Sequence, residues 1–112
     1  TSKLLHFSND GDYLAVLESG APILSIINTK TYAETKVNLD FVPTSFIWSP
    51  NDQYLILAAD GLYWITPDGT QIRKMDINVK SDISAMDMTS DGNKLALGLF
   101  DGTILILIPE NK

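Results

Sequence analysis

The sequence predicts an all-β protein made of short antiparallel strands, and two observations carry this prediction. A large apolar residue, a polar turn led by serine or threonine, and a leucine recur in the same order at Phe7–Leu14, Trp48–Leu55 and Met88–Leu95. The copies begin about 40 residues apart, a period typical of repeats that contain four strands each. Turn residues also interrupt the chain about every 8–12 residues, and no window keeps the 3.6-residue spacing of an amphipathic helix.

Each copy reads as a meander of strands, and the middle copy is the clearest. The strands expected there are residues 45–49, 54–59, 62–66 and 71–75, separated by polar turns. The corresponding segments of the other copies are 3–7, a run from Leu14, 23–27 and 34–39, then a strand ending at Met88, 94–99 and 103–108. Asp60-Gly61 and Asp101-Gly102 each join two apolar runs, so we expect two-residue type I′ turns, which need positive φ at both positions.

The hydrophobic pattern differs between inner and outer strands. Leu55–Ala59, Leu95–Leu99 and Ile104–Ile108 are apolar on both faces, so both faces need to be covered by neighbouring sheets. Thr35–Leu39 and Gln71–Met75 alternate polar and apolar residues, as exposed edge strands do. Apolar inner strands and alternating outer strands are typical of a propeller blade. The expected blades are residues 1–40 and 44–76 and an incomplete third at 83–109.

The repeats resemble those of the WD-repeat β-propellers. The resemblance rests on residues 7–14, 48–55 and 88–95 and on Asp101-Gly-Thr-Ile104 at the start of a third strand, and it covers essentially the whole chain. It implies a β-propeller portion built of four-stranded antiparallel blades. No Gly-His dipeptide opens a repeat, and the positions of the family's Trp-Asp hold Ile27-Asn28, Ile65-Thr66 and Leu107-Ile108. Related propellers of bacterial envelopes, membrane trafficking and nuclear pores fit the same departures.

The expected strands, four, four and then three, form an open array of eleven rather than a closed ring, which takes four or more blades. Both terminal blades would then present an apolar face, and the third blade an open edge. The simplest explanation is that these residues belong to a longer propeller. The alternative is that two or three copies of the chain pool their blades.

Composition narrows the partner classes. The chain holds 8 Lys and Arg against 14 Asp and Glu, a net charge of −6, so we expect no nucleic-acid partner. It contains no cysteine, which excludes disulfides, thiol nucleophiles and thiolate metal sites. No segment approaches the roughly 20 apolar residues of a membrane span, so we expect no direct membrane insertion. Our working compartment is the cytoplasm, although a cysteine-free domain is also compatible with nucleus or periplasm.

The sequence offers no catalytic constellation. His6 is the only histidine, and it lies in an apolar strand between Leu5 and Phe7, which favours a structural strand residue over a ligand or general base. The aspartates fall in turns, where the side chain usually accepts a hydrogen bond from its own backbone, and they lack calcium-loop spacing; they are Asp10, Asp12, Asp52, Asp60, Asp68, Asp91 and Asp101. We therefore expect no catalytic, cofactor or metal site within these residues.

Aromatic residues are the remaining candidates for partner contacts. Trp48 occupies the position held by Phe7 and Met88, which favours packing between blades. Tyr63 and Trp64 lie in a third strand, where one ring faces the next blade and the other reaches the rim. Phe100, just before a turn, is the best candidate for an exposed contact. Five cations are expected as solvated edge charges: Lys30, Lys36, Arg73, Lys74 and Lys80.

Together these features favour a non-catalytic scaffold for protein–protein interaction. Its expected partners are other protein subunits, the rest of the same propeller, or copies of the chain itself, with Phe100, Tyr63 and Trp64 as candidate contacts. The alternative from another class is a propeller domain of an envelope or peptidase-type enzyme whose catalytic residues lie outside this chain. Both readings rest on the family resemblance rather than on a site.

Overall fold

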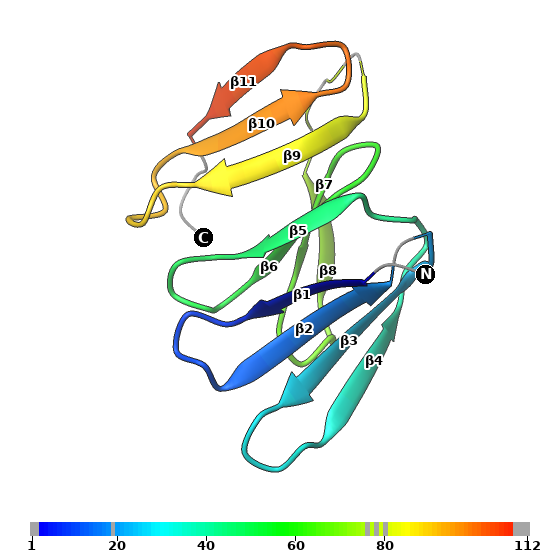
Figure 1. The fold of residues 1–112 in the computed structure, drawn as a ribbon. Helices are drawn as coiled ribbons and strands as arrows, with labels where there is room; N and C mark the ends of the chain where they lie inside the picture. Colours follow the sequence, from blue (N-terminus) through cyan, green and yellow to red (C-terminus); the bar gives the residue numbers. More distant parts are fainter. Residues whose placement is uncertain (1–2, 19, 76, 78, 80, 109–112) are drawn as a thin grey trace.

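The computed structural model describes residues 3–18, 20–75, 77, 79 and 81–108, and in them the chain forms three antiparallel sheets (Figure 1). The predicted all-β fold with eleven strands in an open array is confirmed, and no sheet closes on itself. The strands are β1 (Lys3–Phe7), β2 (Tyr13–Glu18), β3 (Ile23–Asn28), β4 (Glu34–Asn38), β5 (Ser45–Trp48), β6 (Leu55–Ala58), β7 (Leu62–Ile65), β8 (Ile72–Met75), β9 (Ile83–Met88), β10 (Leu95–Leu99) and β11 (Ile104–Leu107).

Each sheet is a meander in which consecutive strands pair. The first sheet has the order β1-β2-β3-β4, the middle sheet β5-β6-β7-β8, and the third sheet β9-β10-β11. The sheets follow one another along the molecule, with the middle one between the other two (Figure 1). The sheets contact one another mainly through their first strands: β1 contacts β5, and β5 contacts β9. The second strand of the middle sheet, β6, also contacts β9. This arrangement is blade-like.

One hydrogen-bonded turn occurs four times and explains why the strands begin where they do. In its first copy the Ser8 hydroxyl donates to Asp10 Oδ1 at 2.7 Å, and the same Oδ1 accepts from the Asp12 N–H at 2.9 Å. The Ser8 hydroxyl then accepts from the Tyr13 N–H at 3.0 Å, at the start of β2. The same bonds recur in the turns that begin at Ser49, Thr66 and Thr89. Short polar side chains thus replace the backbone partners that the turn lacks.

The expected type I′ turns at the two Asp-Gly pairs are not formed. Strands β10 and β11 are joined through Phe100, Asp101 and Gly102, and of these only Gly102 has positive φ, at 92°. The Leu99 N–H donates to Thr103 O and the Gly102 N–H to Leu99 O, which fits a three-residue hairpin with glycine in the left-handed position. Gly61 is not among the positive-φ residues. The aspartates therefore avoid the strain that type I′ geometry would impose on them.

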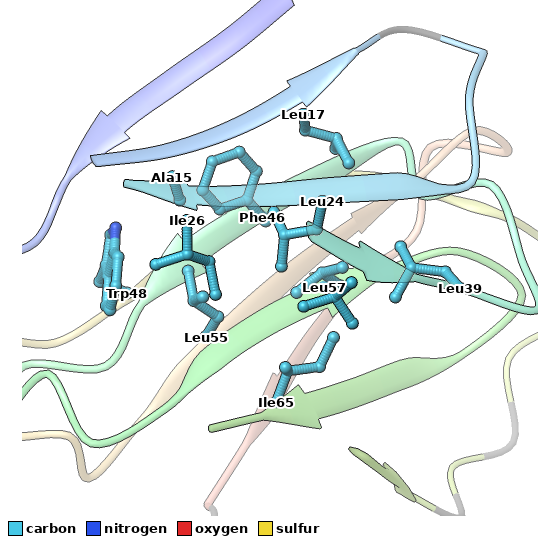
Figure 2. Packing of buried hydrophobic residues seen from close by; sticks show 11 residues of the cluster. Ala15, Leu17, Leu24, Ile26, Leu39, Phe46, Trp48, Leu55, Leu57 and Ile65 are labelled. Atoms are coloured by element: carbon cyan, nitrogen blue, oxygen red, sulfur yellow. The ribbon is translucent and has the colours of Figure 1, made fainter. Parts of the chain in front are cut away.

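Two apolar clusters hold the sheets together. The cluster between the first and middle sheets is drawn in Figure 2, where Phe46, Leu55 and Leu57 of the middle sheet lie against Leu24 and Ile26 of the first. The other cluster joins the middle and third sheets through β6, β7, β9 and β10. Every residue of β6 is buried, because this strand has a sheet on each side.

The expectation that both faces of every inner strand are covered holds only for the middle sheet. β10 and β11 are covered on one face, and Ile104, Ile106 and Ile108 are exposed. The third sheet has a neighbour on one side only among the described residues. β4 and β8 are exposed outer strands, as predicted, but they do not both alternate: in β4 only Val37 is buried, and in β8 only Met75 is half-buried.

Candidate interaction surfaces

Trp48, Met88 and Phe7 occupy the same place in the repeat but differ in burial. Trp48 is 8% exposed; its ring stacks on Tyr13 with the centroids 6.3 Å apart, and its Nε1–H donates to His6 O at 3.0 Å. Met88 is half-buried against the second cluster. Phe7, the third member, is 64% exposed. Trp48 confirms the prediction of packing between sheets, whereas Phe7 points to a side of the first sheet on which the described residues place no neighbour.

The outer face of the first sheet, here called the first end face, is apolar across three strands. The register pairs Leu5 with Val16 and Phe7 with Leu14, and Leu14 in turn with Ile27, which places these five side chains on one face. The corresponding residues of the middle sheet face the first sheet and are buried; they are Phe46, Trp48, Leu55, Leu57 and Ile65. The first end face is therefore the uncovered counterpart of a surface that is covered one sheet further along.

The third sheet carries a second end face on its outer side. The register pairs Gly98 with Ile104 and Ala96 with Ile106, so the two isoleucines stand beside residues with small side chains. Ile104 and Ile106 are 68% and 67% exposed, whereas Leu24 and Ile26, at the corresponding positions of the first sheet, are 0% and 2% exposed. The same apolar pattern is thus buried at the first boundary and exposed on the second end face.

A groove of about 740 Å³ lies between the outer half of the middle sheet and the third sheet. Its lining includes Trp64, Arg73, Met75, Met88, Asp91 and Ile108. Trp64 and Arg73 are cross-strand partners on β7 and β8. The Trp64 ring meets Tyr54 edge to face, with the centroids 5.8 Å apart, which fixes one wall of the groove.

The structure separates the three aromatic residues expected to contact partners. Phe100 is 68% exposed at its turn, and half-buried Trp64 lines the groove. Tyr63 instead faces the first sheet, where it stacks on Phe41 with the ring centroids 3.7 Å apart. Tyr63 therefore belongs to the packing between sheets, whereas Phe100 is exposed and Trp64 is partly exposed.

The hydroxyl of Tyr63 anchors a small charged group at the rim of the first boundary. It donates to Asp60 Oδ1 at 2.9 Å, and Lys74 Nζ lies 3.6 Å from Asp60 Oδ2 and 5.5 Å from the centroid of the tyrosine ring. The hydrogen bond from Tyr63 and the charge of Lys74 lower the pKa of Asp60. Burial, together with the acceptor Asp60, raises the pKa of Tyr63. Lys74 is thus paired rather than only solvated, as is Lys30, whose Nζ lies 3.6 Å from Asp12; Lys80 lies outside the described residues.

His6 and the turn aspartates have structural partners. The exposed His6 ring meets Phe46 edge to face at 5.1 Å. Asp10, Asp68, Asp91 and Asp101 each accept the N–H two residues ahead. This bond is the main cause of the lowered pKa of Asp10 and Asp68, whereas the hydroxyls of Thr89 and Thr103 contribute most to the lowered pKa of Asp91 and Asp101. Asp12, Asp52 and Asp60 also lie between strands, and they have further partners: Asp12 and Asp60 pair with lysines, and Asp52 binds another turn. No group of three metal-ligating side chains occurs among the described residues, and none of their segments forms a helix able to span a membrane.

A link between two turns was not foreseen from the sequence. The Asp52 carboxylate accepts the Asn9 N–H at 2.8 Å, the Asp10 N–H at 2.9 Å and the Asn9 side-chain amide at 2.8 Å. The same amide also donates to Ser49 O at 2.9 Å. These bonds join the first and middle sheets at their turn ends. The one sequence signal was Asp52 in a turn position where the other three copies have glycine.

The chain matches no known protein-family model, and no curated protein matches it in sequence. The resemblance to WD-repeat propellers is therefore one of repeat pattern and of blade-like sheets.

Proposed function

We propose that the chain is a portion of a WD-repeat-like β-propeller and acts as a non-catalytic scaffold for protein–protein interaction. Three blade-like sheets with shared turns and a shared apolar pattern support the propeller assignment. The single observation that supports the scaffold role is the pair of uncovered end faces. Each repeats a surface that is buried at a boundary between two sheets of this same chain.

Each end face exposes enough apolar side chains for their burial to drive association with another sheet. Burying one exposed isoleucine or phenylalanine side chain completely is worth about 1.5–3 kcal/mol. The second end face exposes Ile104 and Ile106, and the first exposes Leu5 and Phe7. A large contiguous patch of exposed apolar side chains marks a site of interaction with another protein or a ligand.

The occupant that fits an end face is another antiparallel sheet with an apolar side. Within the chain, the surface of the first sheet that bears Leu24 and Ile26 packs on the surface of the middle sheet that bears Phe46 and Trp48. The second and first end faces correspond to these two surfaces, respectively. Such a contact joins unlike surfaces, and a blade of another subunit or of the remaining propeller supplies it.

Light scattering of residues 1–112 over a wide concentration range tests the scaffold role. We expect the mass to rise with concentration because the end faces associate, and Ile106→Asp to lower the mass toward that of one chain without lowering the melting temperature. Asn38→Asp is the control, since it also adds one charge at an exposed strand position. A wild-type chain that stays folded and monomeric at every concentration would contradict the proposal.

A further inference from the structure

Five aspartates of the chain are followed directly by glycine, which makes each pair a candidate site of a spontaneous rearrangement of the backbone. The pairs are Asp10-Gly11, Asp60-Gly61, Asp68-Gly69, Asp91-Gly92 and Asp101-Gly102. In this rearrangement the glycine nitrogen attacks the carboxyl carbon of the aspartate, and glycine has no side chain to hinder the approach. The rate at each pair therefore depends on how firmly the fold fixes the two reacting groups.

The reaction needs only water. A bond forms from the glycine nitrogen to the aspartate Cγ, and the carboxyl hydroxyl leaves with the amide proton as water, which closes a cyclic imide. Water then adds back to the imide. Where it breaks the bond between the nitrogen and the original backbone carbonyl, the main chain continues through the side-chain carbonyl. The product is an isoaspartate of unchanged mass, with a free carboxylate on Cα.

Four of the five pairs are fixed by the same two backbone hydrogen bonds. The aspartate carboxylate accepts the N–H two residues ahead at 2.9–3.0 Å. The glycine N–H donates to the carbonyl three residues before it at 2.8–3.0 Å. These four pairs lose both bonds before they react, so their turns slow the rearrangement.

Asp60-Gly61, between β6 and β7, differs from the other pairs in its backbone. In the part of the chain that the structure describes, the Gly61 N–H donates no hydrogen bond, and the Asp60 carboxylate accepts none from the Leu62 N–H. The other four glycines have positive φ, and Gly61 does not. Neither reacting group of this pair is therefore fixed as it is in the four turns.

The Asp60 carboxylate is instead fixed by two side chains at the rim of the first boundary. Tyr63 Oη donates to it at 2.9 Å, and Lys74 Nζ lies 3.6 Å away, with both charged side chains more than half exposed. Lys74 also covers Gly61, which is buried, since a Cβ added there would lie 3.4 Å from Lys74 Cε. An exposed ion pair is weak, so motion of Lys74 readily uncovers the glycine nitrogen.

We propose that Asp60-Gly61 is a site of spontaneous isoaspartate formation that reacts before the other four pairs, with Tyr63 and Lys74 as the positioning residues that limit its rate. This chemistry does not depend on the scaffold role. The product adds one carbon to the backbone between β6 and β7 and displaces the carboxylate from Tyr63. Because Tyr63 stacks on Phe41 and packs against the first cluster, the modified chain is expected to have a weaker first boundary.

The test compares the five pairs within one sample. Residues 1–112 are kept at neutral pH in buffer and, in parallel, in guanidinium chloride. Isoaspartate at each pair is then measured by peptide separation and fragment-ion mass spectrometry. In denaturant, where no turn persists, we expect similar rates at all five pairs, since glycine follows each aspartate. In buffer we expect Asp60 to keep the largest share of its rate in denaturant.

Two variants test the contacts that position Asp60. Tyr63→Phe keeps the ring and removes the hydrogen bond, and it is expected to raise the rate at Asp60 by about two- to tenfold, the factor that corresponds to one hydrogen bond. The rates at the other four pairs are expected to stay unchanged, whereas a general loss of structure would raise all five. Gly61→Ala is the matched control: its methyl group hinders the attack, and it meets only the flexible end of Lys74. We expect this variant to remain folded and to form several-fold less isoaspartate at Asp60.

Three outcomes would overturn the proposal. One is another pair that keeps as large a share of its rate in buffer as Asp60 does. Another is the absence of isoaspartate at Asp60 in buffer when the denatured sample forms it. The third is an unchanged rate at Asp60 in Tyr63→Phe.

Discussion

The two boundaries between sheets are built from the same repeat but differ in quality. At the first, Val37 of β4 and Leu39 just after that strand are buried, and the turns are joined through Asn9 and Asp52. At the second, no hydrogen bond between the corresponding turns is found among the described residues, and a groove of about 740 Å³ opens in the outer half. The first boundary is packed across the full width of the sheets, whereas the second is packed only in its inner half.

The difference follows from two positions of the repeat. Pro50 stands where the first copy has Asn9, so both the backbone and side-chain donors are missing. Gly92 stands where the middle copy has Asp52, so the acceptor is missing too; a Cβ added at Gly92 would lie 3.8 Å from Pro50 Cδ, so the two turns are close but hold no such link. The leucine pattern is therefore sufficient to stack the sheets, and polar turn residues decide how firmly each pair is joined.

The largest expected change in stability comes from removing a buried side chain from the first boundary. Leu57→Ala removes a fully buried side chain from the first cluster, which is expected to lower the free energy of unfolding by about 2–5 kcal/mol. Urea unfolding followed by tryptophan fluorescence measures the loss, because Trp48 lies in the same cluster. Ile106→Ala is the matched control on an exposed strand position. We expect it to change the free energy of unfolding by less than about 0.5 kcal/mol, and equal losses in both variants would contradict the difference in burial between the first boundary and the second end face.

A smaller change in stability is expected from building the same hydrogen-bonded link between turns at the second boundary. Pro50→Asn together with Gly92→Asp restores the donors and the acceptor that the first boundary uses. Gly92 has φ of 76°, so Gly92→Asp alone is expected to be destabilising. The two substitutions together are expected to be more stable than the sum of the single changes by about 0.5–1.5 kcal/mol.

A double-mutant cycle in thermal or urea unfolding measures this coupling. Asn9→Ala at the first boundary is the complementary change, and we expect it to lower the free energy of unfolding by about 0.5–1.5 kcal/mol. A coupling of zero in the cycle, with both single variants folded, would show that side chains other than these two set the quality of the boundary.

Much of the fold was predictable because it depends on local pattern. Strand positions, turns and the burial of Trp48 follow from alternation and from the Ser/Thr-led turn, which act within a few residues. Features that depend on a neighbouring sheet were not predictable. The exposure of Phe7 and Ile106 depends on what lies beside each sheet, and the Asn9–Asp52 link depends on how two turns about 40 residues apart meet. The type I′ turns failed because composition does not fix hairpin length when a three-residue loop is also allowed.

The smallest effect concerns the turns that flank the two boundaries at low pH. Asp10 and Asp91 have a lowered pKa in the folded chain, because each accepts a backbone N–H and a hydroxyl hydrogen bond. Their contribution to stability is present above the ordinary aspartate pKa of 3.8 and is lost as the pH falls through the lower folded value. Asn51 holds the same turn in the middle copy without a titrating group. Asp10→Asn and Asp91→Asn are therefore expected to keep the turn and to flatten the decline of the melting temperature below about pH 4. A decline as steep as that of the wild type in both variants would assign the acid sensitivity to other carboxylates of lowered pKa, such as Asp60 beside Tyr63.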